Sequence, residues 1–207
     1  DITRFLQPHK NTIALWYAPE SGREPSKQLS MEYYGYDAKG KYFYHKANGD
    51  WKCCILKGCY IKKEIEAFDA CSYDNQWKSP DFDRSKWLNP LGAYNQSRDY
   101  RLINNPFERG HCTIRHIMSP IDVYRDQKSI YYDFGKAFKG TPRITLREAK
   151  RKETINMDGF RYTCNGELDE QAFRRFTNKS QRIIKIYSNS QYFKESQIVN
   201  IEGLENE

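Results

Sequence analysis

Short apolar and aromatic runs recur along the chain at intervals of roughly ten residues, and turn-forming residues separate them. Residues 143–147 alternate polar and apolar side chains, which is the period of a strand with one buried face. Residues 33–44 contain two tyrosine-rich runs around a turn at 37–40, and this pattern predicts a β-hairpin. The pattern predicts further strands at 12–18, 51–61, 113–117, 129–134, 160–164, 183–187 and 197–201. Many short strands with regular turns are typical of a β-sandwich, so we expect an all-β fold of the jelly-roll or lectin-like type, with one or two short helices.

Two segments interrupt this strand pattern. Residues 168–177 predict a helix that Asp169 caps at its N-terminus. Residues 74–92 are polar and rich in turn residues, which predicts either a long loop or a boundary. We expect a single β-rich domain over 1–207, with an internal boundary near 90–105 as the open alternative. We interpret the hairpin tyrosines as cross-strand packing, and an outward-facing binding surface is the alternative.

Composition narrows the class of protein. Only 38% of the residues are hydrophobic, but 15% are aromatic, which argues against a disordered chain. The net charge is +7, which favours acidic partners, although lysine and arginine are spread along the chain as on an ordinary solvated surface. No apolar run approaches the length that spans a membrane, so we expect no membrane-spanning segment. We do not expect nucleic acid as a partner.

Six cysteines form an even set, and no pair has the CxxC spacing of a metal site. We therefore expect disulfide bonds and no metal or other cofactor. Fifteen pairings remain open, and adjacent cysteines cannot easily bridge each other. The alternative is a set of reduced, buried thiols. The predicted disulfide cysteines are Cys53, Cys54, Cys59, Cys71, Cys112 and Cys164.

Disulfide bonds persist mainly in proteins exported from the cell, and two sequons also favour export. Asn95 and Asn178 each begin an Asn-x-Ser triplet, which marks N-glycosylation sites. The first residues lack the basic and apolar regions of a signal peptide, as expected of a secreted chain whose signal has been removed. We therefore predict a secreted or extracellular glycoprotein.

Two stretches resemble sugar-binding β-sandwiches. Residues 77–87, WKSPDFDRSKW, resemble the W-x-x-x-D-F-D-D-S-x-W segment of galactose-binding-like domains. Residues 134–162, with Phe138, Gly140 to Leu146 and Asn156 to Phe160, are similar to the strand pattern of H-type lectins. These resemblances imply a lectin-like sandwich that recognises sugar, and the second implies an oligomer.

We predict ligand contacts on the basis of these two stretches. Trp77 and Trp87 would stack on a sugar ring, and Asp83 would accept hydrogen bonds from its hydroxyls. Arg147, in a basic run at 147–152, would pair with an acidic group, and Tyr162 would complete the site. The alternative is that both tryptophans pin a loop onto the core.

Two segments suggest enzymatic alternatives. Glu108-Arg109-Gly110-His111, with His116 nearby, resembles the D-R-G-H segment of ββα-metal nucleases, in which the histidine activates water. Residues 143–148 resemble the R-T-E-L-R-E strand of jelly-roll alginate lyases, and Tyr192-Phe193-Lys194 resembles their later Y-F-K strand. In such lyases arginine neutralises a uronate carboxylate.

No nucleophile elbow, phosphate-binding loop or HExxH segment is present in the sequence. We therefore predict a non-catalytic extracellular recognition module that binds carbohydrate or a glycosylated surface, including anionic ones. A structural protein–protein or adhesion module is the first alternative, and homo-oligomers belong to either case. A lyase that acts on acidic polysaccharide is the second alternative.

Overall fold

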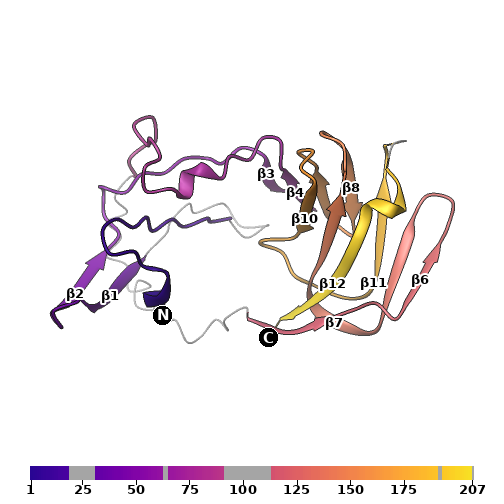
Figure 1. Cartoon of the computed structure of the whole chain (residues 1–207), viewed down its shortest axis with the longest axis horizontal. Helices are drawn as coiled ribbons and strands as arrows, with labels where there is room; N and C mark the ends of the chain where they lie inside the picture. Colours follow the sequence, from indigo (N-terminus) through magenta and orange to yellow (C-terminus); the bar gives the residue numbers. More distant parts are fainter. Residues whose placement is uncertain (19–30, 63–64, 91–112, 191–192, 207) are drawn as a thin grey trace. The chain divides into compact units, whose positions relative to one another are not determined.

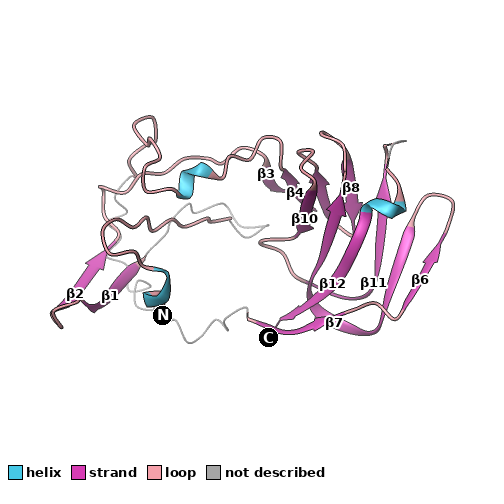
Figure 2. Cartoon of the chain, viewed as in Figure 1, coloured by secondary structure: helices cyan, strands magenta, loops and turns pink. Residues whose placement is uncertain are grey.

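The computed structural model describes residues 1–18, 31–62, 65–90, 113–190 and 193–206 (Figure 1). The chain divides into two compact units, which we describe separately. Unit 1 comprises Asp1–Ile55 and Asn75–Arg109, and unit 2 comprises Leu56–Asp74 and Gly110–Glu207. Strands dominate the described residues, and the helical segments among them are short 3-10 turns, so the predicted all-β class is confirmed (Figure 2). The prediction of one domain over 1–207 stays a prediction, and most of the proposed boundary at 90–105 lies outside the described residues.

Unit 1 contains the predicted hairpin. Strands β1 (Glu32–Tyr36) and β2 (Tyr42–Lys46) pair antiparallel, with Tyr34 opposite Tyr44. The Asp37 carboxylate accepts hydrogen bonds from the N–H groups of Lys39 and Lys41, and Gly40 has φ 76°, which completes the tight turn. The other elements of unit 1 are η1 (Thr3–Phe5), η2 (Gln76–Lys78) and an isolated bridge between Cys53 and Leu88.

Unit 2 is a strand-rich body whose long strand β7 (Ile130–Arg147) is the centre of the pairing. The other elements are β3 (Cys59–Lys62), β4 (Ile65–Asp69), β5 (Ile114–Met118), β6 (Asp122–Arg125), β8 (Thr154–Met157), β9 (Phe160–Thr163), β10 (Asp169–Phe173), β11 (Lys179–Ser188), η3 (Glu195–Gln197) and β12 (Ile198–Asn206). The first half of β7 pairs with β6 and β11, and its second half pairs with β10 and β12. One continuous strand therefore pairs with four others, two along each half.

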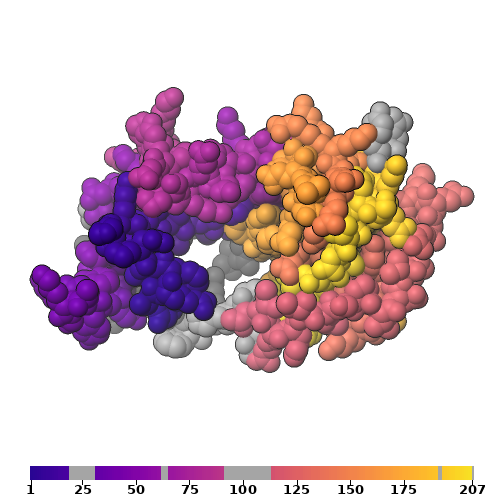
Figure 3. Space-filling model, viewed as in Figure 1, coloured from indigo at the N-terminus to yellow at the C-terminus, as the bar shows by residue number. Residues whose placement is uncertain are grey.

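The order of the main sheet is β3-β4-β9-β8-β11-β7-β12-β5, with β6 and β10 each paired to β7. All these pairs are antiparallel except β4 with β9. The space-filling view shows the pink β6–β7 segment and the yellow C-terminal segment side by side on the surface of unit 2 (Figure 3). Residues far apart in the sequence thus form one surface.

The core of unit 2 lies on the inward face of these strands. Side chains alternate between buried and exposed along β7, as the strand period requires. Ile144, Leu146, Ile184 and Ile186 are completely buried. Burial of a branched aliphatic side chain of this kind contributes about 1.5–3 kcal/mol, so these rows stabilise the fold of unit 2.

Glu66 is a buried charge that ties β4 to the segment after β10. Its side chain is fully buried, and its carboxylate accepts hydrogen bonds from the N–H groups of Arg175, Phe176 and Thr177. The Thr177 hydroxyl donates a further bond at 2.8 Å. These four donors compensate the carboxylate for the water that it loses on burial.

The predicted helix over 168–177 is wrong, because residues Asp169–Phe173 form strand β10 on the edge of β7. Buried Glu170 accepts hydrogen bonds from the Tyr162 hydroxyl and from the N–H groups of Asn165 and Gly166, which holds this strand in place.

Most of the other predicted strands are confirmed, with two changes. The strands expected at 129–134 and 143–147 are both parts of β7. Residues 12–18 form no strand, and Trp16 in this segment meets Trp77 edge to face. Within 51–61, only β3 and the bridge at Cys53 have strand pairing.

The prediction of disulfide bonds is not supported. The five cysteines in the described residues are free thiols, namely Cys53, Cys54, Cys59, Cys71 and Cys164. The Cys71 thiol donates a hydrogen bond to the Cys164 carbonyl at 3.0 Å, and the Cys53 thiol donates to the Leu88 carbonyl. These sulfurs therefore use main-chain acceptors rather than each other. Cys112 lies outside the described residues.

Candidate functional site

One outward row of side chains crosses five strands of unit 2. The pairing registers place these residues opposite one another in sequence across β3, β4, β9, β8 and β11. Paired residues share one face of a sheet, so the row points away from the core. We call this set the outer row: Tyr60, Ala67, Arg161, Asn156 and Tyr187.

The neighbouring row faces the core and fixes this orientation. Phe68, Tyr162 and Ile155 are opposite one another on β4, β9 and β8, and all three are buried. The rings of Phe68 and Tyr162 stack with centroids 5.8 Å apart. Because strand side chains alternate, the row one residue away must face outward.

Two inner positions of the outer row are buried and form its floor, and its two ends are exposed. Ala67 and Asn156 are 4% and 8% exposed, whereas Tyr60 and Tyr187 are 52% and 38% exposed. Arg161 is also exposed, and its Nε donates to the Asn156 Oδ1 at 3.4 Å. A pocket of about 590 Å³ lies over this floor. It is lined by Gly58, Tyr60, Ala67, Phe68, Asp69, Ser72, Thr154, Asn156, Arg161, Thr163 and Asn189.

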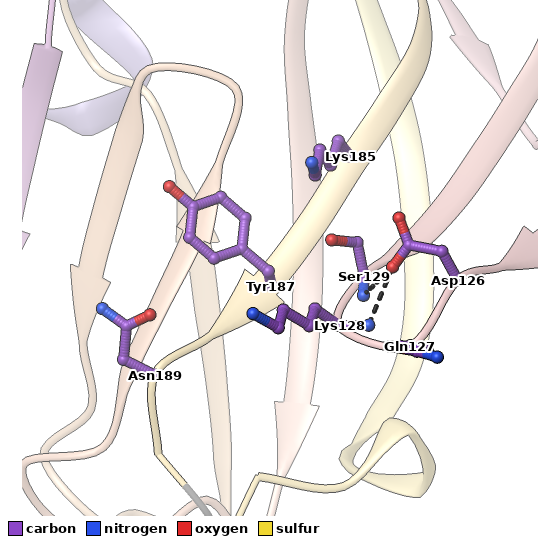
Figure 4. Close-up of a pocket in the computed structure, with 7 residues that line it drawn as sticks. All are labelled: Asp126, Gln127, Lys128, Ser129, Lys185, Tyr187 and Asn189. Atoms are coloured by element: carbon purple, nitrogen blue, oxygen red, sulfur yellow. Dashed lines mark hydrogen bonds between the residues drawn. The ribbon is translucent and has the colours of Figure 1, made fainter.

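A second pocket, of about 620 Å³, lies at the Tyr187 end of the row (Figure 4). The turn between β6 and β7 forms one side, and β11 with the residues after it forms the other. Figure 4 shows Lys128 extending from the turn toward Tyr187 and Asn189. The lining residues are Asp126, Gln127, Lys128, Ser129, Lys185, Tyr187 and Asn189. Asn189 lines both pockets, and we call the two adjoining pockets together the groove.

Hydrogen bonds to Asp126 hold the turn rigid. Its Oδ1 accepts from the N–H groups of Lys128 and Ser129, and its Oδ2 accepts from the Tyr131 hydroxyl at 2.8 Å. The bond from the Lys128 N–H is the largest cause that lowers the pKa of the Asp126 carboxyl. The carboxylate therefore stays ionised and positions the Lys128 main chain at the mouth of the pocket.

Lys185 lies between two tyrosine rings. Its Nζ is 5.5 Å from the centroid of the Tyr131 ring and 5.8 Å from that of Tyr187, within the range of cation–π attraction. A hydrogen bond with the Tyr131 side chain raises the pKa of Lys185, so the amine remains charged. The pocket thus combines an exposed aromatic ring with two ammonium groups and an amide, a mixture that suits a polar ligand with apolar faces.

Three of the predicted ligand contacts lie in unit 1. Trp77 is 6% exposed, packs against Trp16, and accepts a hydrogen bond from Arg84 at its carbonyl. It has no open ring face, and this agrees with the alternative that the tryptophan pins a loop. Trp87 is half-buried, with its ring centroid 5.8 Å from that of Phe82. Asp83 is exposed and accepts bonds from the main chain and hydroxyl of Ser85.

The other two predicted contacts lie in unit 2, and neither lines the groove. Arg147 is exposed but pairs with Asp169, with 2.8 Å between Nε and Oδ1. Tyr162 is 4% exposed and donates its hydroxyl proton to Glu170. Burial, followed by the charge of Glu170, raises the pKa of this phenol, which stays neutral. Tyr162 is therefore a core residue with a satisfied hydroxyl. For Asp83, Trp87 and Arg147, ligand contact stays a prediction.

The hairpin in unit 1 presents tyrosines on one open face. Tyr34, Tyr36, Tyr42 and Tyr44 are between 43% and 74% exposed. Tyr36 and Tyr42 pack edge to face across the strands at 5.6 Å. The opposite face holds Tyr33, which stacks on the ring of His45. Cross-strand packing and an outward tyrosine surface therefore coexist here.

The residues behind the enzymatic alternatives have other partners. His116 Nδ1 is 2.8 Å from the Glu205 carboxylate on the neighbouring strand, and His111 lies outside the described residues. Arg143 pairs with Glu202, so its charge is already neutralised. Tyr192 lies outside the described residues.

The remaining predictions concern metals, membranes and glycosylation. Within the described ranges, no group of three or more His, Cys, Asp and Glu side chains could hold a metal ion. The part of the chain that the structure describes has no helix long and apolar enough to cross a membrane. Asn178 is exposed and accepts a hydrogen bond from Asn206, whereas Asn95 lies outside the described residues.

Three solved structures resemble this chain in fold. They are the α-L-rhamnosidase from Dictyoglumus thermophilum (TM-score 0.64, 18% identity), that of Streptomyces avermitilis complexed with L-rhamnose (0.63, 18%) and the native enzyme from Aspergillus terreus (0.60, 14%). Each match covers 84% of this chain but only 22%, 18% and 22% of the respective enzyme. The chain therefore spans about a fifth of these enzymes, and at this identity the likeness shows the fold alone.

No protein-family model matches the chain, and the comparison with curated proteins returns no match either.

Sequence reasoning missed most of the groove. The alternation over 183–187 could have placed Lys185 and Tyr187 on the outward face, because Ile184 and Ile186 are the apolar positions. Lys128 and Asn189 carry no such signal, since only the pairing of β11 with β7 brings them together.

Proposed function

We propose that this chain is a non-catalytic recognition module that binds carbohydrate in the groove of unit 2. The observation that carries the proposal is the pocket at Tyr187, where a ring that is 38% exposed adjoins Lys128, Lys185 and Asn189. Aromatic rings stack on the apolar face of a sugar, and nearby polar groups bond its hydroxyls. The adjoining floor of the outer row extends the site beyond one sugar.

The structural neighbours suggest which sugar to test first. All three are α-L-rhamnosidases, and one is complexed with L-rhamnose. A β-sandwich that makes up about a fifth of such an enzyme suits a role in holding a glycan rather than cleaving it. We therefore propose rhamnose-containing glycans as ligands, and with them an extracellular location, where such glycans occur.

A structural or adhesive role is the second candidate. The exposed tyrosine face of the hairpin favours it, because contiguous exposed aromatic surface marks protein interaction sites. In this candidate the interaction surface is the hairpin of unit 1 and not the groove. A variant of each surface therefore distinguishes the two candidate functions.

Binding of L-rhamnose and rhamnose-containing oligosaccharides, measured by isothermal titration calorimetry, tests the proposal. Tyr187→Ala should weaken binding at least about tenfold, which corresponds to about 1.4 kcal/mol. Tyr36→Ala removes an equally large exposed ring on the hairpin and should leave the affinity unchanged. Thermal unfolding of both variants would verify that they fold. If no saccharide bound, or if Tyr187→Ala bound as the original chain does, the proposal would fail.

A further inference from the structure

We propose that the groove is built for an acidic glycan, namely an oligosaccharide with uronate carboxylates that spans both pockets across Asn189. This inference rests on the proposed function and names the ligand class that the same site would take. The argument depends on the cations of the groove, on its carboxylates and on its length.

Among the described residues, the cations of the groove form no direct ion pair, although Asp126 contributes, after the Tyr131 side chain, to the raised pKa of Lys185. Lys128, Lys185 and Arg161 form no ion pair with any carboxylate in the described residues. Within the described ranges, the Arg161 side chain bonds one acceptor, the amide oxygen of Asn156, through its Nε, so its two terminal nitrogens are available there. Lys128 and Arg161 can therefore meet an anion without first breaking an ion pair.

Four other arginines of unit 2 each bond a carboxylate of another element: Arg125 with Glu195, Arg143 with Glu202, Arg147 with Asp169, and Arg182 with Asp133. Arg161 differs from these four although it lies on the same sheet. Its planar guanidinium suits a carboxylate, because it can donate two parallel hydrogen bonds.

The carboxylates that line the groove already accept hydrogen bonds from neighbouring groups of the protein. Asp126 accepts three hydrogen bonds within its own turn. Asp69, in the pocket over the floor, accepts from the Cys71 N–H at 2.9 Å and from the Ser72 hydroxyl at 2.7 Å. Their charge is partly balanced by these donors, so they repel an incoming anion less than free carboxylates would.

The groove is long enough for several sugars. Tyr60 and Tyr187 stand at the two ends of the outer row, which are four strand spacings or about 19 Å apart. Arg161 lies between them, and the two lysines lie beyond or beside Tyr187. Charges spaced along the groove match a chain with carboxylates on successive or alternate sugars, whereas a single sugar could reach only one pocket.

Titration calorimetry with matched ligands tests the inference. The probes are short galacturonate oligosaccharides and the same oligosaccharides after reduction of their carboxyl groups to alcohols. The acidic form should bind at least about tenfold more tightly at low salt, and the difference should shrink as ionic strength rises.

Variants test whether the preference for acidic oligosaccharides arises in the groove. Arg161→Gln and Lys128→Gln should each reduce the preference for the acidic form several-fold. Lys139→Gln removes an exposed lysine opposite Ser180, about 23 Å along β11 from Tyr187, and should leave the preference unchanged.

The outcomes separate this inference from the proposed function. Equal binding of acidic and reduced oligosaccharides would overturn the acidic ligand while sugar binding stood, and so would binding of the rhamnose oligosaccharides alone. Equal binding of dextran sulfate would show general attraction of anions and would also overturn it. Absence of binding to every saccharide would overturn both proposals. The expected preference, lost in Arg161→Gln and kept in Lys139→Gln, would support both.

Discussion

Five cysteine residues sit in clearly different surroundings within the two units. Cys53 is exposed, Cys164 is completely buried, and Cys59, the first residue of β3, is half-buried. Burial, together with the nearby charge of Glu66, raises the pKa of the Cys59 thiol to about 11. Burial also raises the pKa of Cys164. Because the thiolate is the reactive form, these differences should appear as different labelling rates.

Labelling of the native protein with iodoacetamide, followed by mass spectrometry of its peptides, measures those rates. At pH 8 we expect Cys53 to react readily, and Cys59 slowly, since on the order of 0.1% of it is thiolate. Between pH 8 and pH 10 the rate at Cys59 should rise about tenfold per pH unit, in step with the thiolate fraction. Denatured protein, in which all six cysteines should react without a reductant, is the control. Cysteines that react only after reduction would restore the disulfide prediction.

Individual residues show why part of the site could not be predicted from the sequence. Trp77 and Tyr162 are both among the predicted ligand contacts, but both rings are buried. A ring offers the same apolar surface to a core as to a ligand, and the sequence alone does not distinguish the two. Burial follows from which strands pair, and that is a property of the whole fold.

At the scale of elements, β10 illustrates the same limit. Its buried positions include Glu170 and Ala172, and buried Arg174 follows it directly, so the polar–apolar alternation of a strand is hidden. Without a visible alternation, Asp169 resembles the N-cap of a helix, and a helix is predicted instead of a strand. Tertiary hydrogen bonds to Glu170 make this burial tolerable, and they come from residues that pattern analysis does not connect. By contrast, residues 143–147 have apolar buried positions, and their strand was predicted correctly.

The close pairing of β7 with β12 depends on a glycine. Gly140 is opposite Lys179 on β11 and Glu205 on β12, so strands flank it on both sides. A Cβ at this position would overlap the carbonyl oxygen of Leu204. The backbones of β7 and β12 approach more closely here than any other residue type would allow.

Gly140→Ala should therefore lower the free energy of unfolding by about 1–3 kcal/mol, because β12 must shift to relieve the overlap. Urea unfolding monitored by circular dichroism measures the change. Gly49→Ala is the matched control, since nothing lies within 4 Å of a Cβ there. That variant should be neutral or slightly stabilised through the lower entropy of the unfolded chain. An unchanged midpoint for Gly140→Ala would mean that β7 and β12 do not approach this closely in solution.

At the scale of the whole molecule, the all-β class was predictable because it depends on the recurrence of short runs rather than on any one residue. Disulfide bonds, which the cysteine count predicts, are not needed to hold unit 2 together. Its core contains long aliphatic rows on β7, β8 and β11. Unit 1 is different, since Trp77 is the one buried hydrophobic side chain among its described residues.

This difference predicts that the two units open at different free energies. Amide hydrogen exchange reports local opening, and regions with few buried apolar contacts exchange first. The amides of β1 and β2 should exchange at least about a hundredfold faster than those of β7 and β11 at the same pH, which corresponds to a difference of about 2.8 kcal/mol. Hydrogen exchange measured by mass spectrometry on peptides from each unit gives the comparison, and Gly140→Ala should speed exchange in unit 2 selectively. Equal protection of β1 and β7 would show that both units unfold in one cooperative step, with unit 1 stabilised by more than its own buried side chains.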